Sequence, residues 1–160
     1  MLSIAFGRRV LVALLFALAL SPAVAPAQPG PEPLDLVRGF YAPDYRNDQM
    51  PLSPRLAALL DAAIANSRKH DAPVTGLDFA WQLNAQDSEP GFEKTLKLTQ
   101  TARSADSATV RASFYNGREE EIDYRLLRQN GWWVVDDIDY LKGEATSLSE
   151  MLKTGASETP

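Results

Sequence analysis

The sequence predicts an α+β domain in which helices pack on a curved antiparallel sheet of at least four strands. Residues 53–70 repeat their apolar side chains with the period of a helix, whereas residues 92–140 alternate apolar and polar side chains as strands do. Asn116 and Gly117 lie between two of the alternating segments, and an Asn-Gly pair is the strongest short signal of a β-hairpin. Helices followed by hairpin-connected strands therefore set the expected architecture.

Residues 1–27 have the pattern of a secretory signal peptide. Arg8 and Arg9 precede the apolar run Val10–Leu20, which is shorter than the roughly 20 residues that a membrane-spanning helix needs. Small residues before Gln28 suit cleavage after Ala27. The alternative is a membrane anchor that stays attached. We expect a periplasmic or secreted chain, cleaved near Ala27, with no stable membrane insertion after cleavage.

Charge and composition exclude several classes of function. The net charge is −5 at pH 7, and loss of Arg8 and Arg9 with the signal peptide would make it more negative. Such a chain repels phosphate backbones, so we do not expect it to bind nucleic acid. The sequence contains no cysteine, which rules out disulfides, a thiol nucleophile and an acylated cysteine.

The helical part of the domain is expected to begin near Leu34, after a proline-rich tether at residues 28–33. Apolar side chains at residues 34–41 have helical spacing, and Pro43 ends this short helix. The second helix, residues 53–70, has Ser53 as its N-cap and Pro54 at its first position. Residues 71–91 have a weak pattern that fits either a short helix or irregular structure.

The strands are expected at residues 92–99, 110–114, 122–126 and 132–140, joined by turns at residues 103–108, 115–118 and 129–131. A short capped helix follows at residues 147–153, and residues 154–160 are predicted to be disordered. One domain, residues 34–153, therefore contains all the predicted elements.

Several short motifs, in this order and spacing, resemble a known bacterial family. They are "FYAPDY" at 40–45, "LSPRLAALL" at 52–60, "NAQD" at 84–87, "GWWVVDDIDY" at 131–140 and "SLSEML" at 147–152. The family is domain of unknown function 3828, which is found mostly in exported proteins and lipoproteins. It resembles the nuclear-transport-factor-2-like, or cystatin-like, cone folds. The resemblance implies this fold and an exported location, but it implies no reaction.

The cone folds usually enclose a pocket between the concave sheet face and the helices, so polar residues pointing inward are the candidates for a site. The sequence offers five ligand-pocket candidates: Tyr41, Tyr45, Gln86, Asp87 and Asp137. Each has a structural alternative. Asp87 can instead cap a turn, and Asp137 can instead accept hydrogen bonds that fix a strand end. No catalytic residue is assigned among them.

The segment "WWVVDDIDY" places three aspartates within four residues. Strand alternation assigns Asp137 to the face of Trp133, and Asp136 to the opposite face, with a bulge or bend near the two aspartates. We therefore do not count the three acids as one cluster. Carboxylates along a strand do not wrap a calcium ion, and we expect neither a metal nor a cofactor. Only one of Trp132 and Trp133 is expected to face the core.

Two functional hypotheses follow. The leading one is a non-enzymatic binding or interaction module that contacts a small ligand or another envelope protein. The alternative is a cone-fold enzyme that performs proton abstraction or hydrolysis with Asp137 as its base and a tyrosine as hydrogen-bond donor. The sequence does not indicate an oligomeric state.

Overall fold

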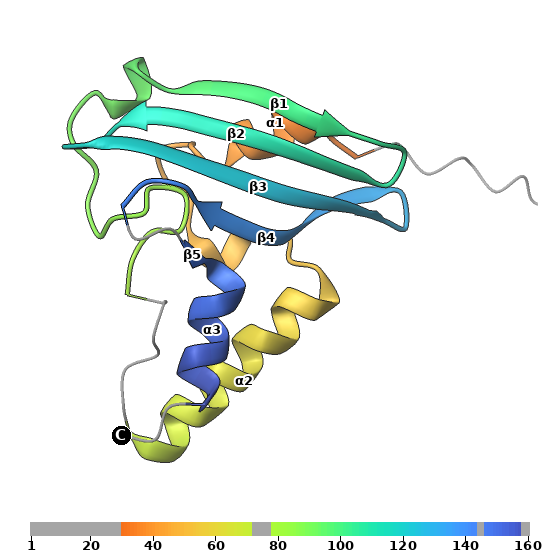
Figure 1. Ribbon diagram of the computed structural model, residues 1–160, viewed down its shortest axis with the longest axis vertical. Coiled ribbons are helices and arrows are strands. Elements are labelled where there is room, and N and C mark those ends of the chain that lie inside the picture. Colours follow the sequence, from red (N-terminus) through yellow and green to blue (C-terminus); the bar gives the residue numbers. More distant parts are fainter. Residues whose placement is uncertain (1–29, 72–77, 144–145, 158–160) are drawn as a thin grey trace, which may run out of the picture.

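A computed structural model describes residues 30–71, 78–143 and 146–157. Its centre is one five-stranded antiparallel sheet with the strand order β1-β2-β3-β4-β5 (Figure 1). The strands are β1 (Lys97–Arg103), β2 (Ser107–Tyr115), β3 (Glu119–Gln129), β4 (Trp132–Tyr140) and β5 (Thr146–Ser147). The helices are α1 (Pro33–Gly39), α2 (Pro54–His70) and α3 (Leu148–Ser157), with 3-10 turns η1 (Asn47–Gln49) and η2 (Phe92–Lys94). The predicted α+β fold is confirmed.

The two tight hairpins lie where the turn residues predict them. Asn130 and Gly131 join β3 to β4 and both have a positive φ, 52° and 85°, as a two-residue hairpin turn requires. Between β2 and β3, Tyr115 pairs with Glu119, and Gly117 has a φ of 75°. The residue types at these turns therefore determine which strands become neighbours.

One face of the sheet forms the core together with α1. Alternate residues of the three long strands are buried there: Ala108, Val110, Ala112, Phe114, Ile122, Tyr124, Leu126, Trp133, Val135, Ile138 and Tyr140. The buried Val37 and Phe40, at and just after the end of α1, belong to the same apolar cluster. Figure 1 shows α1 lying behind β1 and β2.

Helices α2 and α3 pack against each other beyond the β4–β5 edge of the sheet (Figure 1). Ser53 caps α2 as predicted, because its side chain accepts a 3.1 Å hydrogen bond from the backbone N–H of Leu56. Leu56 and Ala63 of α2, and Leu148 and Leu152 of α3, are fully buried. No helix in the described segments is both long and apolar enough to cross a bilayer.

Strand β4 contains the bulge that the sequence suggested. Leu126 of β3 pairs with Val135, whereas the preceding Arg125 pairs with Asp137, so Asp136 is an extra residue in β4. The extra residue reverses the alternation. Ile138 joins the buried face, and Asp137 moves to the opposite face beside Arg125. The assignment of Asp137 to the face of Trp133 was therefore wrong, because the extra residue of a bulge exchanges the two faces for the residues that follow it.

Three expected boundaries also differ from the structure. Pro33, assigned to the tether, is the buried first residue of α1, a position that tolerates its missing N–H. Residues 92–94 form η2, so the first strand begins at Lys97. Residues 154–157, predicted to be disordered, continue α3, because the buried Gly155 packs against α2 and accepts a 2.9 Å hydrogen bond from Asn66.

The remaining expectations fall partly outside the described residues. Residues 78–91 are irregular apart from an isolated bridge between Ala80 and Ala85, which agrees with one of the two alternatives for this segment. The predicted signal peptide and its cleavage site, residues 28–29 of the tether, and residues 158–160 lie outside what the structure describes.

Candidate functional site

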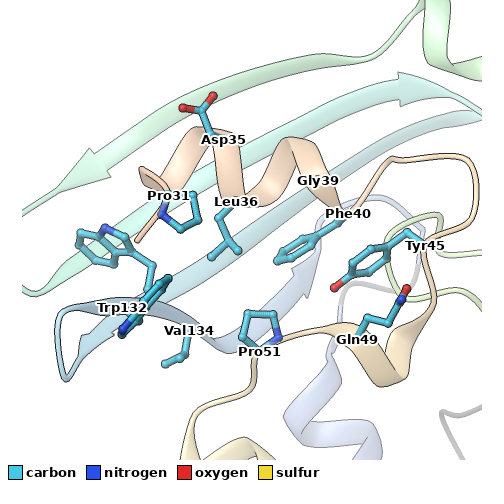
Figure 2. A pocket seen from close by; sticks show the side chains of 11 residues that line it. Pro31, Asp35, Leu36, Gly39, Phe40, Tyr45, Gln49, Pro51, Trp132 and Val134 are labelled. Atoms are coloured by element: carbon cyan, nitrogen blue, oxygen red, sulfur yellow. The ribbon is translucent and has the colours of Figure 1, made fainter. Parts of the chain in front are cut away.

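An apolar groove of about 550 Å³ lies between α1, the segment that follows it, and the first half of β4 (Figure 2). We call it the α1–β4 groove. It is lined by Pro31, Asp35, Leu36, Gly39, Phe40, Tyr45, Gln49, Pro51, Trp132, Trp133 and Val134. Most of these side chains are apolar, and three separate stretches of chain contribute them. The groove therefore exists only in the folded protein.

The two adjacent tryptophans have different environments, as expected for neighbours on a strand. Trp133 is buried, and the guanidinium groups of Arg103 and Arg128 each lie 5.9 Å from its ring centre. Trp132 is 50% exposed although it is the largest type of apolar side chain. Because Trp132 also lines the groove, a ligand that fills the groove can cover it.

Tyr45 contributes a hydroxyl group to this region that has no hydrogen-bond partner in the described part of the chain. Its ring lies 5.2 Å from that of Phe40, and Figure 2 shows its hydroxyl pointing toward the space between Phe40 and Pro51. Burial raises the pKa of Tyr45, and the nearby carboxylate of Asp48 raises it further. The hydroxyl is therefore a neutral hydrogen-bonding group at the edge of an apolar surface.

A second pocket, also of about 550 Å³, lies on the other side of Phe40 and Tyr45. We call it the Tyr41–Asp87 pocket. It is lined by Phe40, Tyr41, Ala42, Pro43, Tyr45, Ala80, Gln82, Leu83, Gln86, Asp87, Ser88, Phe92 and Glu93. Four of the five candidates from the sequence, Tyr41, Tyr45, Gln86 and Asp87, line this one pocket.

Contacts with core residues fix the position of Tyr41 in the wall of the Tyr41–Asp87 pocket. Its hydroxyl is 3.0 Å from the hydroxyl of the buried Tyr124, and its ring is edge-on to Phe114. Burial raises the pKa of Tyr41, and the neighbouring Tyr124 adds to the shift. Both phenols are therefore neutral at ordinary pH and act only as hydrogen-bonding groups.

The fifth candidate, Asp137, lines neither pocket. Its side chain is buried, and one carboxylate oxygen accepts hydrogen bonds from the backbone N–H groups of Ile138 (2.9 Å) and Ser149 (3.0 Å). The other accepts from the hydroxyl of Ser149 at 2.5 Å and from Arg125 at 2.8 Å. Asp137 thus joins the first turn of α3 to the sheet, which is the structural alternative that the sequence left open.

The three aspartates do form one cluster, contrary to the expectation from alternation. Arg55 of α2 contacts both Asp136 and Asp137, and Arg125 contacts both Asp137 and Asp139. The bulge brings the acids together, and the two arginines offset their charge. Among the described residues, no group of three or more His, Cys, Asp or Glu side chains is placed to hold a metal ion.

The α1–β4 groove was not predicted from the sequence. Tyr45 is the one predicted candidate that lines it. A signal was present, because the paired tryptophans open the last long strand and Gly39 leaves the end of α1 without a side chain. Nothing local in the sequence indicated that α1 and β4 would lie side by side.

Comparisons with known proteins identify no family. The chain matches no family model and no curated protein. Among solved structures it matches a phospholipid-binding protein from Ralstonia solanacearum, solved in complex with a phospholipid, with 18% sequence identity and a TM-score of 0.33. The match covers 64% of this chain and 50% of that protein, so it spans half of the neighbour's length. A similarity this weak carries no argument about the ligand.

Proposed function

We propose that this protein is an exported, non-enzymatic binding module that holds a small, largely apolar ligand in the α1–β4 groove. The observation that carries the proposal is the groove itself, an open apolar concavity of about 550 Å³ with the half-exposed Trp132 at its edge. A large exposed aromatic side chain beside an apolar concavity is typical of a binding surface.

The polar groups of the groove are few, as in most small-molecule sites. The hydroxyl of Tyr45 lacks a partner among the described residues, and Gln49 is exposed at the rim, so a ligand with one polar end has hydrogen-bonding groups available. The side chain of Asp35 is paired with Arg38. The expected ligand is therefore an apolar chain or ring that carries a single uncharged polar group.

The competing hypothesis, a cone-fold enzyme with Asp137 as base, receives no support from the geometry. Both carboxylate oxygens of Asp137 already accept hydrogen bonds, and the side chain is buried against α3. A general base must reach the proton that it removes. Membership of the family of unknown function named above stays a prediction, since no family model matches.

Binding can be tested with a series of straight-chain alcohols of six, eight and ten carbons, measured by isothermal titration calorimetry. Each buried methylene contributes about 0.8 kcal/mol, so two more carbons should tighten binding roughly tenfold until the groove is full. Affinity that does not depend on chain length would contradict the proposal.

Gly39 offers a matched pair of variants for the same test. Gly39 lines the groove, and a Cβ at this position meets no atom within 4 Å. Gly39→Phe is therefore chosen to block the groove with a large side chain, whereas Gly39→Ala adds only one carbon. Gly39→Phe should weaken binding of the ten-carbon alcohol at least tenfold, and Gly39→Ala should not. For the exposed tryptophan, Trp132→Ala should weaken binding, whereas Tyr115→Ala is the control because Tyr115 is 49% exposed but does not line the groove.

Export is tested separately. The full-length gene, expressed with a C-terminal tag in a Gram-negative bacterium, should give a periplasmic product whose mass corresponds to a chain that begins at Gln28. An uncleaved, membrane-bound product would support the anchor instead.

A further inference from the structure

The Tyr41–Asp87 pocket differs from the α1–β4 groove in both charge and chemistry. Asp87 and Glu93 line it, and none of the described residues that line it is Lys, Arg or His. None of the ion pairs among the described residues includes Asp87 or Glu93. Among the described residues, neither an ion pair nor a basic lining side chain therefore neutralises these two carboxylates.

Aromatic rings form much of the remaining wall. The ring centroids of Tyr41 and Phe92 lie 6.5 Å apart, and the ring planes make an angle of 48°. Phe40 and Tyr45 form the wall that the pocket shares with the α1–β4 groove. The faces of such rings attract cations, and the attraction is greatest where water is excluded. Carboxylates beside aromatic faces are thus complementary to a cation that has an organic body.

A third feature of the pocket is a buried hydrogen-bond acceptor that has no partner among the described residues. Gln82 lines the pocket with only 7% of its surface exposed, and its Oε1 has no hydrogen-bond partner in the described part of the chain. Buried polar groups are normally satisfied, and an unsatisfied acceptor costs free energy. A ligand N–H that reaches this buried oxygen would supply the missing hydrogen bond.

We propose that the Tyr41–Asp87 pocket is a second binding site, which takes an organic cation such as a primary ammonium group on an aromatic or aliphatic body. The carboxylates of Asp87 and Glu93 attract the charge, the rings of Tyr41 and Phe92 contact the body, and Gln82 accepts a hydrogen bond from the ammonium group. This site is separate from the apolar groove, with which it shares the wall formed by Phe40 and Tyr45.

The test compares benzylammonium with benzyl alcohol, because the two have nearly the same size and differ in charge. Isothermal titration calorimetry on the whole protein should give at least a tenfold tighter dissociation constant for benzylammonium at pH 7 and low salt. Added salt should reduce the difference, since the charges are partly exposed. Equal binding of the two compounds, or no binding of either, would overturn the proposal.

Variants locate the site. The double variant Asp87→Asn/Glu93→Gln should weaken benzylammonium binding about tenfold and leave benzyl alcohol unaffected. Glu89→Gln is the matched control, because Glu89 is an exposed acid close by in sequence that does not line the pocket. If Glu89→Gln weakens binding as much as the double variant, the attraction is only that of an acidic surface and the proposed site is wrong.

Two further variants distinguish the Tyr41–Asp87 pocket from the α1–β4 groove. Gln82→Leu removes the unsatisfied acceptor, so it should weaken benzylammonium binding without lowering thermal stability; unchanged affinity would contradict a site that includes Gln82. Gly39→Phe is designed to block the α1–β4 groove and should leave benzylammonium binding unchanged. A loss of benzylammonium binding in Gly39→Phe would place the cation in the groove and overturn the second site.

Discussion

Replacing Asp137 should reveal how strongly its carboxylate joins α3 to the sheet. In Asp137→Ala, the backbone N–H groups of Ile138 and Ser149 both lose their acceptor in a buried region. Each buried donor left unsatisfied costs about 1–3 kcal/mol, so the expected loss of unfolding free energy is about 4 kcal/mol. Arg125 adds little, because half of its side chain is exposed and its charge returns to water.

Urea denaturation followed by circular dichroism measures this loss. With a slope of about 1.5 kcal/mol per molar urea, the midpoint of Asp137→Ala should fall by about 2.7 M. Asp137→Asn keeps one carbonyl oxygen for the two N–H groups, so about half of the loss is expected, and this variant remains measurable if the alanine variant does not fold.

Asp139→Asn is the matched control, because Asp139 shares Arg125 but is partly exposed, and its loss should cost less than about 1 kcal/mol. The reasoning is refuted if Asp137→Ala stays within about 1 kcal/mol of the wild type, or if Asp139→Asn is equally destabilising. If Asp137→Asn folds but no longer binds the ten-carbon alcohol or benzylammonium, Asp137 would instead have a role in ligand binding.

Three other changes have defined outcomes. Burial alone would raise the pKa of Asp136, but hydrogen bonds from Arg55 and Ser53 outweigh burial and lower the pKa. The charged form therefore stabilises the fold above about pH 4, and this contribution is lost as the pH falls further. In urea titrations at different pH values, Asp136→Asn should lose less stability on acidification below about pH 4 than the wild type. Gly131→Ala forces a side chain into a left-handed conformation and should lower unfolding free energy by about 1–2 kcal/mol, whereas an unchanged urea midpoint would contradict this. Gly39 lies in helical backbone with free space around an added Cβ, so Gly39→Ala should raise the free energy of unfolding by about 0.4–1 kcal/mol and with it the melting temperature. A lower melting temperature would indicate a clash with a neighbouring side chain.

The elements that the sequence predicts well are those decided by neighbouring residues. Some signals act over only a few residues and need no tertiary partner. They are the Ser53 cap, the apolar period of α2 and the Asn-Gly pairs at two hairpins. The helical continuation of residues 154–157 was missed because it depends on α2, which lies far away in sequence. Local propensity alone gives no sign of such a contact.

The candidate sites divide in the same way. Four predicted residues meet in the Tyr41–Asp87 pocket, because Tyr41 and Tyr45 closely follow α1 and Gln86 and Asp87 lie in one irregular segment packed against them. The α1–β4 groove needs the relative placement of α1 and β4, which periodicity does not encode. The position of Asp137 depended on pairing with β3, and one extra residue was enough to move it to the other face.

The bulge in β4 also indicates which change of length this strand can accept. Deleting either of the adjacent Asp136 and Asp137 leaves the same shorter chain, in which regular alternation still turns Ile138 and Tyr140 inward and keeps one aspartate opposite Arg125. That chain would lose only the carboxylate that accepts hydrogen bonds from Ser53 and Arg55 at the start of α2. Arg55 would keep only its longer contact, 3.5 Å, with the remaining aspartate, so natural relatives with a single aspartate here should more often have replaced Arg55.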